Sequence, residues 1–354
     1  MKVQKKEAKS KGKYWNEHYD YYFALDWSMQ SAALARMRWK STRIRVQELA
    51  ADVRVIRDYV SKFGGRQILC IEETTGTQWL YVELRDYFDR IVVCDPYRNR
   101  LLSDGPKTDK IDAMKLCQLL QMGSLKEVYH SIDSVYEIRK VVSAYEAWNK
   151  FGVRFQNQRS ALYRSQGLNH KRDKLNGQNR YLEIIERGQN EAIALYREKK
   201  QEYLDFFKQL TKENPDLRHL RGISGINYVF AVTILGTVVD ASRFATKYQY
   251  WAYCGLVRYE RMSGGRRYGK RSPRYSRKLK HVYKSAAMTA VGGKNDIREY
   301  YEYLLSQGLP AEKALNTVAR YIATSTYAML KHHVAYNPYQ WRKSHRREET
   351  EEEK

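Results

Sequence analysis

The sequence has few cysteines, and their spacing does not match a zinc site or a disulfide framework. Only four are present in 354 residues, and no two of them form a C-x-x-C pair. Structural zinc sites and disulfide-rich folds both depend on closely grouped ligands. We therefore expect isolated small side chains, buried where the surrounding sequence is apolar. These cysteines are Cys70, Cys94, Cys117 and Cys254.

The sequence also lacks any long apolar run. A membrane-spanning helix needs about 18 or more successive residues of predominantly apolar character, and a secretory signal needs an apolar core near the N-terminus. The chain instead begins with a lysine-rich stretch, MKVQKKEAKSKGK. We expect a soluble, cytoplasmic protein that has no membrane partner.

Positive charge and tyrosine are what the sequence has in excess. Lysine and arginine number 64 against 40 aspartates and glutamates, which gives a formal net charge of +24, and there are 30 tyrosines. A large positive excess mixed with planar side chains suits a polyanion that carries stacked rings. The composition therefore predicts a nucleic-acid partner.

Residues 20–128 predict one α/β domain with a mixed sheet. Three successive strand patterns come first, and strands then alternate with helices that end at glycines or prolines, an order typical of a meander followed by βα units. The expected strands are 21–28, two within 30–49, 67–74 and 90–96, and the expected helices are 51–63, 78–88 and 107–123.

Residues 129–215 differ in character, because apolar residues are sparse but recur at helical spacing. This pattern predicts long helices that form a hairpin or a coiled coil. We expect breaks near Gly167 and Gly177. Such polar helices need a partner along one stripe.

Residues 216–340 predict a second compact, mainly helical domain. Its segment LRGISGINYVFAVTILG resembles a helix-hairpin-helix turn, in which free N–H groups can meet a phosphate. The same Gly-x-x-Gly spacing also marks ordinary tight turns. Residues 1–19 and 341–354 are predicted to be charged tails.

Acidic residues occupy positions in the first domain that suit a magnesium site. Asp26 lies inside an apolar strand, where an unpaired charge is costly. Glu72 and Glu73 end a later strand, and only one of two consecutive strand residues can face a given side of a sheet. Asp109 and Asp112 share one helix face, roughly 5–6 Å apart at Cβ. Carboxylate oxygens are ligands that Mg²⁺ prefers.

The acids of the helix also have a plainer explanation. A solvated acidic face balanced by lysines is the common meaning of a local charge cluster. Lys107, Lys110 and Lys115 supply that balance here.

Four segments in this order, LDWS, EETTGTQW, DPYRNR and KTDKIDA, resemble the DEDD-type insertion-sequence transposases. That family has a RuvC-like, RNase H-type N-terminal domain and is related to the Piv-type invertases. The C-terminal blocks LRGISGINYVFAVTILG and SRFATKYQYWAYCGLVRYERMSGG resemble the second conserved region of the same family. The resemblance covers most of residues 20–338.

The resemblance implies a site. The family pattern Glu-Ala-Thr-Gly fits Glu73-Thr-Thr-Gly76 and favours Glu73 over Glu72. It implies that Mg²⁺ is held by Asp26, Glu73, Asp109 and Asp112.

The family's nucleophilic serine falls on Ser263 in RMSGG. Ser272 and Ser276 also lie in this region, because the sequence after Gly265 departs from the family pattern. Residues 258–280 carry ten lysines or arginines and one glutamate. This patch would meet a phosphodiester and stabilise its developing charge.

The resemblance further implies double-stranded donor and target DNA, a structured bridge RNA as guide, and a homodimer or homotetramer associated with a bacterial or archaeal nucleoid. Two alternatives remain at this point. One is a RuvC-like nuclease that uses metal-activated water, with Ser263 a bystander. The other is a non-catalytic scaffold that binds RNA or DNA.

Overall fold

A computed structural model describes residues 16–96, 108–130, 135–175 and 179–342. The chain forms two compact units, Met1–Ile132 and Asp133–Lys354. Most of the two predicted tails, the predicted break at Gly177 and most of the DPYRNR segment lie outside the described residues.

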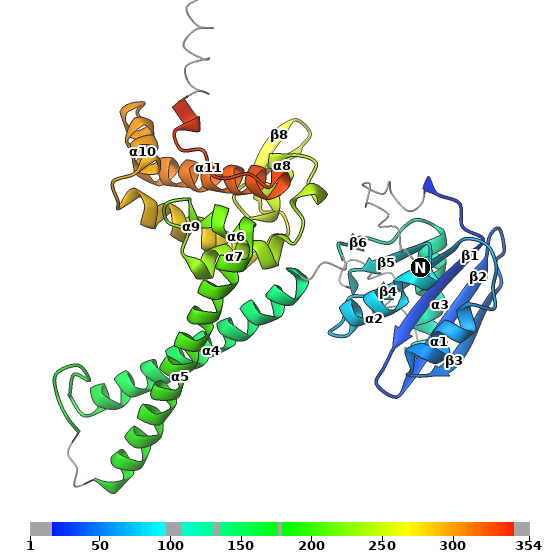
Figure 1. Ribbon diagram of the computed structural model, residues 1–354, viewed down its shortest axis with the longest axis horizontal. Coiled ribbons are helices and arrows are strands. Elements are labelled where there is room, and N and C mark those ends of the chain that lie inside the picture. Colours follow the sequence, from blue (N-terminus) through cyan, green and yellow to red (C-terminus); the bar gives the residue numbers. More distant parts are fainter. Residues whose placement is uncertain (1–15, 97–107, 131–134, 176–178, 343–354) are drawn as a thin grey trace, which may run out of the picture. The chain divides into compact units, whose positions relative to one another are not determined.

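The first unit is built on a six-stranded mixed sheet with the order β3-β2-β1-β4-β5-β6 (Figure 1). The first three strands form an antiparallel meander, β4 and β5 add in parallel to β1, and β6 closes the edge antiparallel. The strands are β1 (Tyr21–Trp27), β2 (Ser31–Arg38), β3 (Ile44–Ala50), β4 (Gln67–Glu72), β5 (Arg90–Cys94) and β6 (Glu127–Val128).

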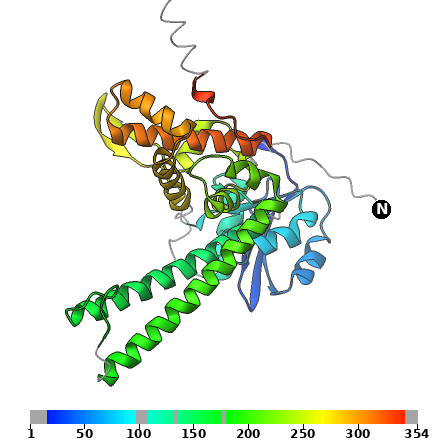
Figure 2. The same cartoon turned by 60° about the vertical axis from the view of Figure 1, so that its left-hand side comes forward.

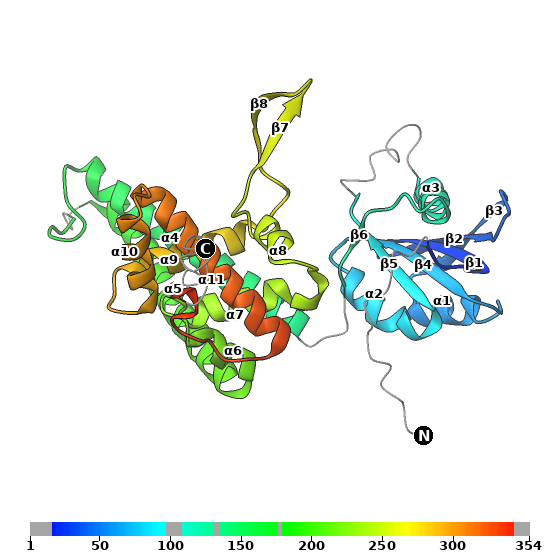
Figure 3. The same cartoon turned by 90° about the horizontal axis from the view of Figure 1, so that it is seen from above.

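Helices cover both faces of this sheet. Figure 3 shows α3 (Asp109–Gln121) on one side and α1 (Val53–Val60) and α2 (Thr77–Leu84), which the 3-10 turn η2 (Arg85–Tyr87) follows, on the other. Alternate strand residues feed two separate cores, one against α3 and one against α1 and α2. The predicted mixed sheet with its helices is confirmed. Strand β6 was not predicted, because two residues carry no readable period.

Caps define where these helices begin. The Asp52 carboxylate accepts a hydrogen bond from Arg54 N at the start of α1, and the Thr108 hydroxyl accepts one from Ile111 N at the start of α3. These contacts satisfy N–H groups that have no partner within the helix. The sequence therefore fixes the first turn of α3, where the two acids lie.

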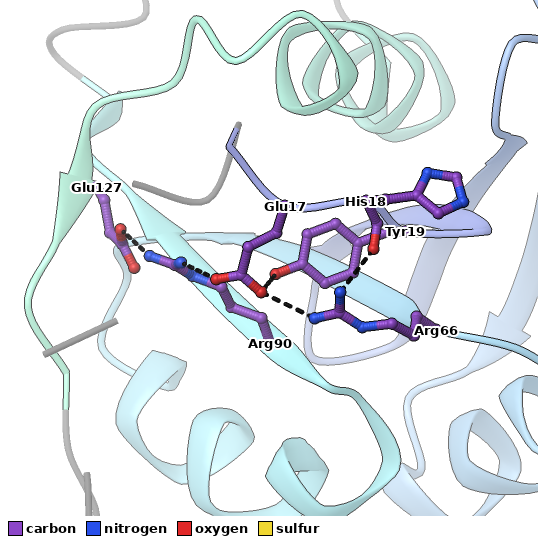
Figure 4. A network of polar contacts seen from close by, with 6 residues as sticks. All are labelled: Glu17, His18, Tyr19, Arg66, Arg90 and Glu127. Atoms are coloured by element: carbon purple, nitrogen blue, oxygen red, sulfur yellow. Dashed lines mark hydrogen bonds and ion pairs between the residues drawn. The ribbon is translucent and has the colours of Figure 1, made fainter. Parts of the chain in front are cut away.

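A polar network holds the chain that leads into β1 (Figure 4). Arg66 donates to Glu17 at 2.8 Å, and the buried Arg90 forms ion pairs with Glu17 at 3.2 Å and Glu127 at 2.9 Å. Tyr19 donates to the same Glu17 carboxylate at 2.9 Å. Burial alone would raise the pKa of Glu17, but the hydrogen bonds from Arg66 and Tyr19 and the two arginine charges lower it overall.

The lowered pKa of Glu17 predicts how stability depends on pH. Ionised Glu17 stabilises the folded unit above the unfolded pKa of about 4.3, and the contribution is lost as pH falls through the lower folded pKa. We expect Glu17→Gln to lower the melting temperature near neutral pH. The difference from the parent should shrink below about pH 4 in calorimetric melts. A difference that is the same at every pH would contradict this assignment.

The second unit begins with two long helices, α4 (Val135–Ser165) and α5 (Arg180–Glu213), which lie side by side (Figure 2). The helices approach closely at Gly152, where an added Cβ would lie 2.2 Å from the Tyr196 ring. The Tyr196 hydroxyl donates to Asn149 at 3.0 Å and fixes the register. The predicted helical hairpin is confirmed, and Gly167, with φ of +70°, follows the end of α4.

Shorter helices complete the second unit. Buried residues of α4 and α5 join the same core as the C-terminal helices, so the segment predicted as a separate middle region shares one compact unit with them. Within the described residues no helix is long and apolar enough to cross a membrane. The remaining helices are α6 (Pro215–Arg221), α7 (Tyr228–Val238), η5 (Ala241–Arg243), α8 (Lys247–Tyr253), α9 (Arg277–Val291), α10 (Asp296–Ser306) and α11 (Ala311–His332).

The turn between α6 and α7 is held by Gly225. Its φ is +89°, and an added Cβ would lie 2.2 Å from the Ala286 carbonyl oxygen of α9. Both the backbone conformation and the close approach require glycine. The predicted Gly-x-x-Gly turn therefore has a packing reason, whether or not it also meets a phosphate.

Glycine substitutions test this packing. Gly225→Ala should destabilise the second unit by about 2 kcal/mol or more, because it adds both strain and a backbone clash. Gly188→Ala is the matched control, since it lies within α5 with no atom within 4 Å of its Cβ position. It should stabilise by up to about 1 kcal/mol. Denaturant unfolding followed by circular dichroism would contradict the assignment if the two variants shifted alike.

Candidate active site

Two acids meet at the carboxyl ends of neighbouring parallel strands. Leu25 of β1 pairs with Ile71 of β4, so the next residue in each strand, Asp26 and Glu72, continues the same register. Asp26 alternates with Ala24, and Glu72 alternates with Cys70, and both of those residues belong to the core beneath α3. Asp26 and Glu72 are therefore neighbours on the α3 face of the sheet.

Glu73 occupies a different place. It lies one residue beyond the end of β4, and its N–H donates to the Cys94 carbonyl at 3.0 Å. The loop that follows is braced by buried Thr77, whose hydroxyl donates to the Glu72 carbonyl at 2.6 Å and accepts from Thr74 N at 2.7 Å. The structure thus brings Glu72 to the face of Asp26, whereas the resemblance selects Glu73.

Helix α3 runs antiparallel to β1 across this face. The Cys117 thiol donates to the Tyr22 carbonyl at 3.3 Å, near the start of β1. At the other end, Lys110 forms a 3.0 Å ion pair with Glu48 of β3. Because Glu48 pairs with Ala33 and Ala33 pairs with Asp26, the first turn of α3 lies over the end of the sheet that carries the acids.

Asp109 and Asp112 belong to that first turn. Each of them lies four residues before a buried residue of α3, Asp109 before Ala113 and Asp112 before Leu116. Acids in a first turn also stabilise a helix through its dipole, which offers a structural reason for them. The sequence-predicted acids from β1 and α3 thus lie at one end of the sheet, with Glu72 beside them.

The donor set fits Mg²⁺ in kind, because each member offers carboxylate oxygens at one end of the sheet. In the conformation described for residues 16–96 and 108–130, no three acidic, histidine or cysteine side chains are close enough together to hold a metal ion. The acids that lie at this end of the sheet are Asp26, Glu72, Asp109 and Asp112.

Sequence reasoning missed Glu48. It lies on the α3 face because it alternates with Ile44 and Val46, which pack against the same core. That alternation is visible in IRVQELA, but only the pairing of β3 with β2 places it in line with Asp26. Its ion pair with Lys110 also holds the first turn of α3.

Ser263 lies at the tip of a two-stranded hairpin. Strand β7 (Tyr259–Ser263) pairs antiparallel with β8 (Arg266–Arg271), and every residue of both strands is exposed. Gly264 and Gly265 form the turn with φ of +54° and +77°, as two-residue hairpin turns require. The serine therefore lies in a strand of defined register.

The base of the hairpin is fixed to the second unit. Gly255, with φ of +68°, leaves room for the Tyr275 ring, which would lie 2.5 Å from an added Cβ. Ser276 N donates to the Tyr253 carbonyl at 2.8 Å, and its hydroxyl caps α9 by accepting from Leu279 N. Ser276 thus has a structural role, which sets it apart from Ser263.

No hydrogen bond links the Ser263 hydroxyl to a base within the part of the chain that the structure describes. Burial raises the pKa of the Cys117 thiol to about 12. Burial also raises the pKa of the Cys70 thiol above its ordinary value. All four cysteines are free and buried, which confirms the predicted burial of Cys70, Cys94 and Cys117, although the sulfurs of Cys70 and Cys94 lie 3.6 Å apart and are not isolated from each other. Protonated, enclosed thiols are poor nucleophiles, so the exposed hydroxyl is the better candidate.

A comparison with known protein families matches the part of the chain that contains the β7–β8 hairpin, which is called the ribbon below. Residues 217–302 match the family model described as the transposase IS116/IS110/IS902 family. The matched segment runs from within α6 to within α10 and contains both hairpin strands and Ser263. No curated protein matches the chain. The match supports a transposase of the IS110 type, a DNA-rearranging enzyme that binds DNA.

The register generates a prediction about the two adjacent glutamates. If a metal binds at this end of the sheet, we expect Glu72→Gln to weaken Mn²⁺ binding by about tenfold or more, measured by electron paramagnetic resonance, because it would remove the carboxylate beside Asp26. Glu73→Gln is the matched control and should have the smaller effect. The reverse order would place Glu73 in the set, as the resemblance implies.

Proposed function

We propose that this protein is an RNA-guided DNA transposase or recombinase that cuts and rejoins DNA through a covalent bond to Ser263. The single observation that carries the proposal is the position of Ser263, exposed at the tip of an arginine-rich ribbon inside the segment that matches the transposase family. The sheet order of the first unit, a meander joined in parallel by β4 and β5, supports a RuvC-like domain.

The chemistry balances without a high-energy cofactor. The Ser263 hydroxyl oxygen attacks the phosphorus of a DNA phosphodiester, an Oγ–P bond forms, and the bond to one deoxyribose oxygen breaks. The serine proton is lost, and the leaving oxygen gains one. A hydroxyl of the new partner strand then attacks the phosphoserine and releases the serine. One ester is exchanged for another in each step.

The acids of the first unit have a separate role in this proposal. Asp26, Glu72 or Glu73, Asp109 and Asp112 would hold Mg²⁺, which supplies Lewis-acid stabilisation of phosphate charge. The carboxylates would not bind the phosphate directly, because both groups are negatively charged. Glu48 and Lys110 would position the first turn of α3 rather than touch the substrate.

The proposed partners are double-stranded donor and target DNA, a structured guide RNA and further copies of the chain. Two DNA sites must be joined, which favours a dimer or tetramer. The hairpin of α4 and α5 supports such contacts, because Tyr181 and Ile184 are 68% and 59% exposed. Apolar side chains exposed at this level mark interaction surfaces when they cluster.

One observation favours a second candidate, a metal-dependent nuclease that uses water. The Ser263 hydroxyl has no base bonded to it among the described residues, whereas the acids are grouped at one sheet end. In that case Ser263 would serve only DNA binding. The two candidates differ in whether a protein–DNA bond forms.

A trapping experiment separates these candidates. The chain would be expressed with its native flanking DNA, denatured, and searched by mass spectrometry for a residue bonded to DNA. We expect the adduct on Ser263 and its loss in Ser263→Ala and Asp109→Ala. Ser272→Ala is the control variant and should keep the adduct.

Two results would overturn the serine mechanism. Cleaved DNA that Ser263→Ala still produces, with no adduct in the parent, would leave the nuclease. DNA binding without any cleavage by the parent or by the variants would leave the scaffold.

A further inference from the structure

The register of the β7–β8 hairpin divides its side chains between two faces. Tyr259, Arg261 and Ser263 alternate on one face of β7, and their pairing partners on β8 share that face. A bulge between Arg261 and Met262 leaves Tyr268 as the extra residue of β8. The Arg261 guanidinium lies 5.7 Å from the centre of the Tyr268 ring, which places Tyr268 with Arg261.

The two faces differ in charge. The serine face, defined here as the face that carries Ser263, has no acidic residue, and its members are Tyr259, Arg261, Ser263, Arg266, Tyr268, Gly269 and Arg271. The opposite face carries Glu260, Met262, Arg267 and Lys270. Glu260 forms an ion pair with Arg267 at 2.6 Å, so part of the positive charge there is already neutralised.

Packing against the rest of the second unit does not account for the residue types on either face of the hairpin. Every residue of both strands is exposed, with Tyr259 and Tyr268 at 54% and 62%, and the hairpin projects from the helices (Figure 3). Three arginines on one face repel one another without gaining buried contacts. A polyanion that covers this face would relieve that repulsion.

We propose that the serine face of the ribbon is the surface that lies against duplex DNA, with Arg261, Arg266 and Arg271 on phosphates around the one that Ser263 attacks. The inference rests on the proposed function and deepens it by assigning one face. A two-stranded ribbon fits the major groove of B-form DNA, which is about 12 Å wide. Tyr259 and Tyr268 add planar surface beside the arginines.

Matched charge removals on the two faces test the assignment. Arg261→Gln with Arg271→Gln removes two positive charges from the serine face. Arg267→Gln with Lys270→Gln removes two from the opposite face. Both pairs would be made in the full chain with Ser263→Ala, so that cleavage does not interfere. The probe is a labelled random-sequence DNA duplex of about 40 base pairs, roughly four helical turns.

We expect the serine-face pair to weaken binding roughly tenfold at about 0.1 M salt and to reduce the slope of log K against log salt by about 2. The opposite-face pair should change affinity less than about threefold. Because all four side chains are exposed, both variants should melt as the parent does. Equal losses for the two pairs, or no loss for either, would overturn the proposal.

An RNA duplex of the same length is the second probe. A serine-face effect on RNA alone would overturn the DNA assignment and make the ribbon a guide-RNA contact. The adduct experiment is independent of these measurements. An adduct on Ser263 without a face effect would leave the proposed function standing and remove this inference. A face effect without any adduct would keep the DNA surface and remove the serine chemistry.

Discussion

The alternation of side chains along strands is the constraint on which both candidate sites depend. In the first unit it places Asp26 and Glu72 on the face that α3 covers, because each follows an inward-facing core residue by two positions. In the ribbon it places Ser263 with Arg261 and apart from Glu260. A shift of one residue in either register would exchange the faces and separate these groups.

The packing of α3 against the sheet brings the acids of its first turn to the same end as the acids of β1 and β4. Its buried stripe is apolar, so it must lie on the sheet, and the Cys117 contact near the start of β1 sets its direction. An antiparallel α3 brings its N-terminus, which is positive through the backbone dipole, to the end of the sheet that carries carboxylates. The acids Asp109 and Asp112 therefore stabilise the helix and enrich the cluster through one geometry. Helix stability and the proposed metal site make the same demand on these two residues.

The sequence alone was enough to predict those helices and strands whose apolar periodicity is visible within one segment. Apolar alternation and glycine or proline stops predicted all but one of the strands of the first unit, and helical spacing predicted α4 and α5. The choice between Glu72 and Glu73 required the register of β4 against β1, which no local pattern contains. The ribbon was missed because its strands bury nothing and show no apolar alternation. Gly264-Gly265, a glycine pair typical of tight hairpin turns, was the available signal.

The same lack of buried side chains makes the ribbon informative. In a core strand, packing determines which residue types fit. An arginine in such a strand would need a partner within the fold. No packing of that kind constrains β7 or β8, and yet the only acid of the hairpin lies on the face away from Ser263, already paired with Arg267. The hairpin base is anchored by the Tyr275 ring over Gly255, so the exposed strands do not have to be stable alone. If duplex DNA lies against this face, as proposed, the arginines beside Ser263 would meet its phosphates with no acid on the same face to compete for them.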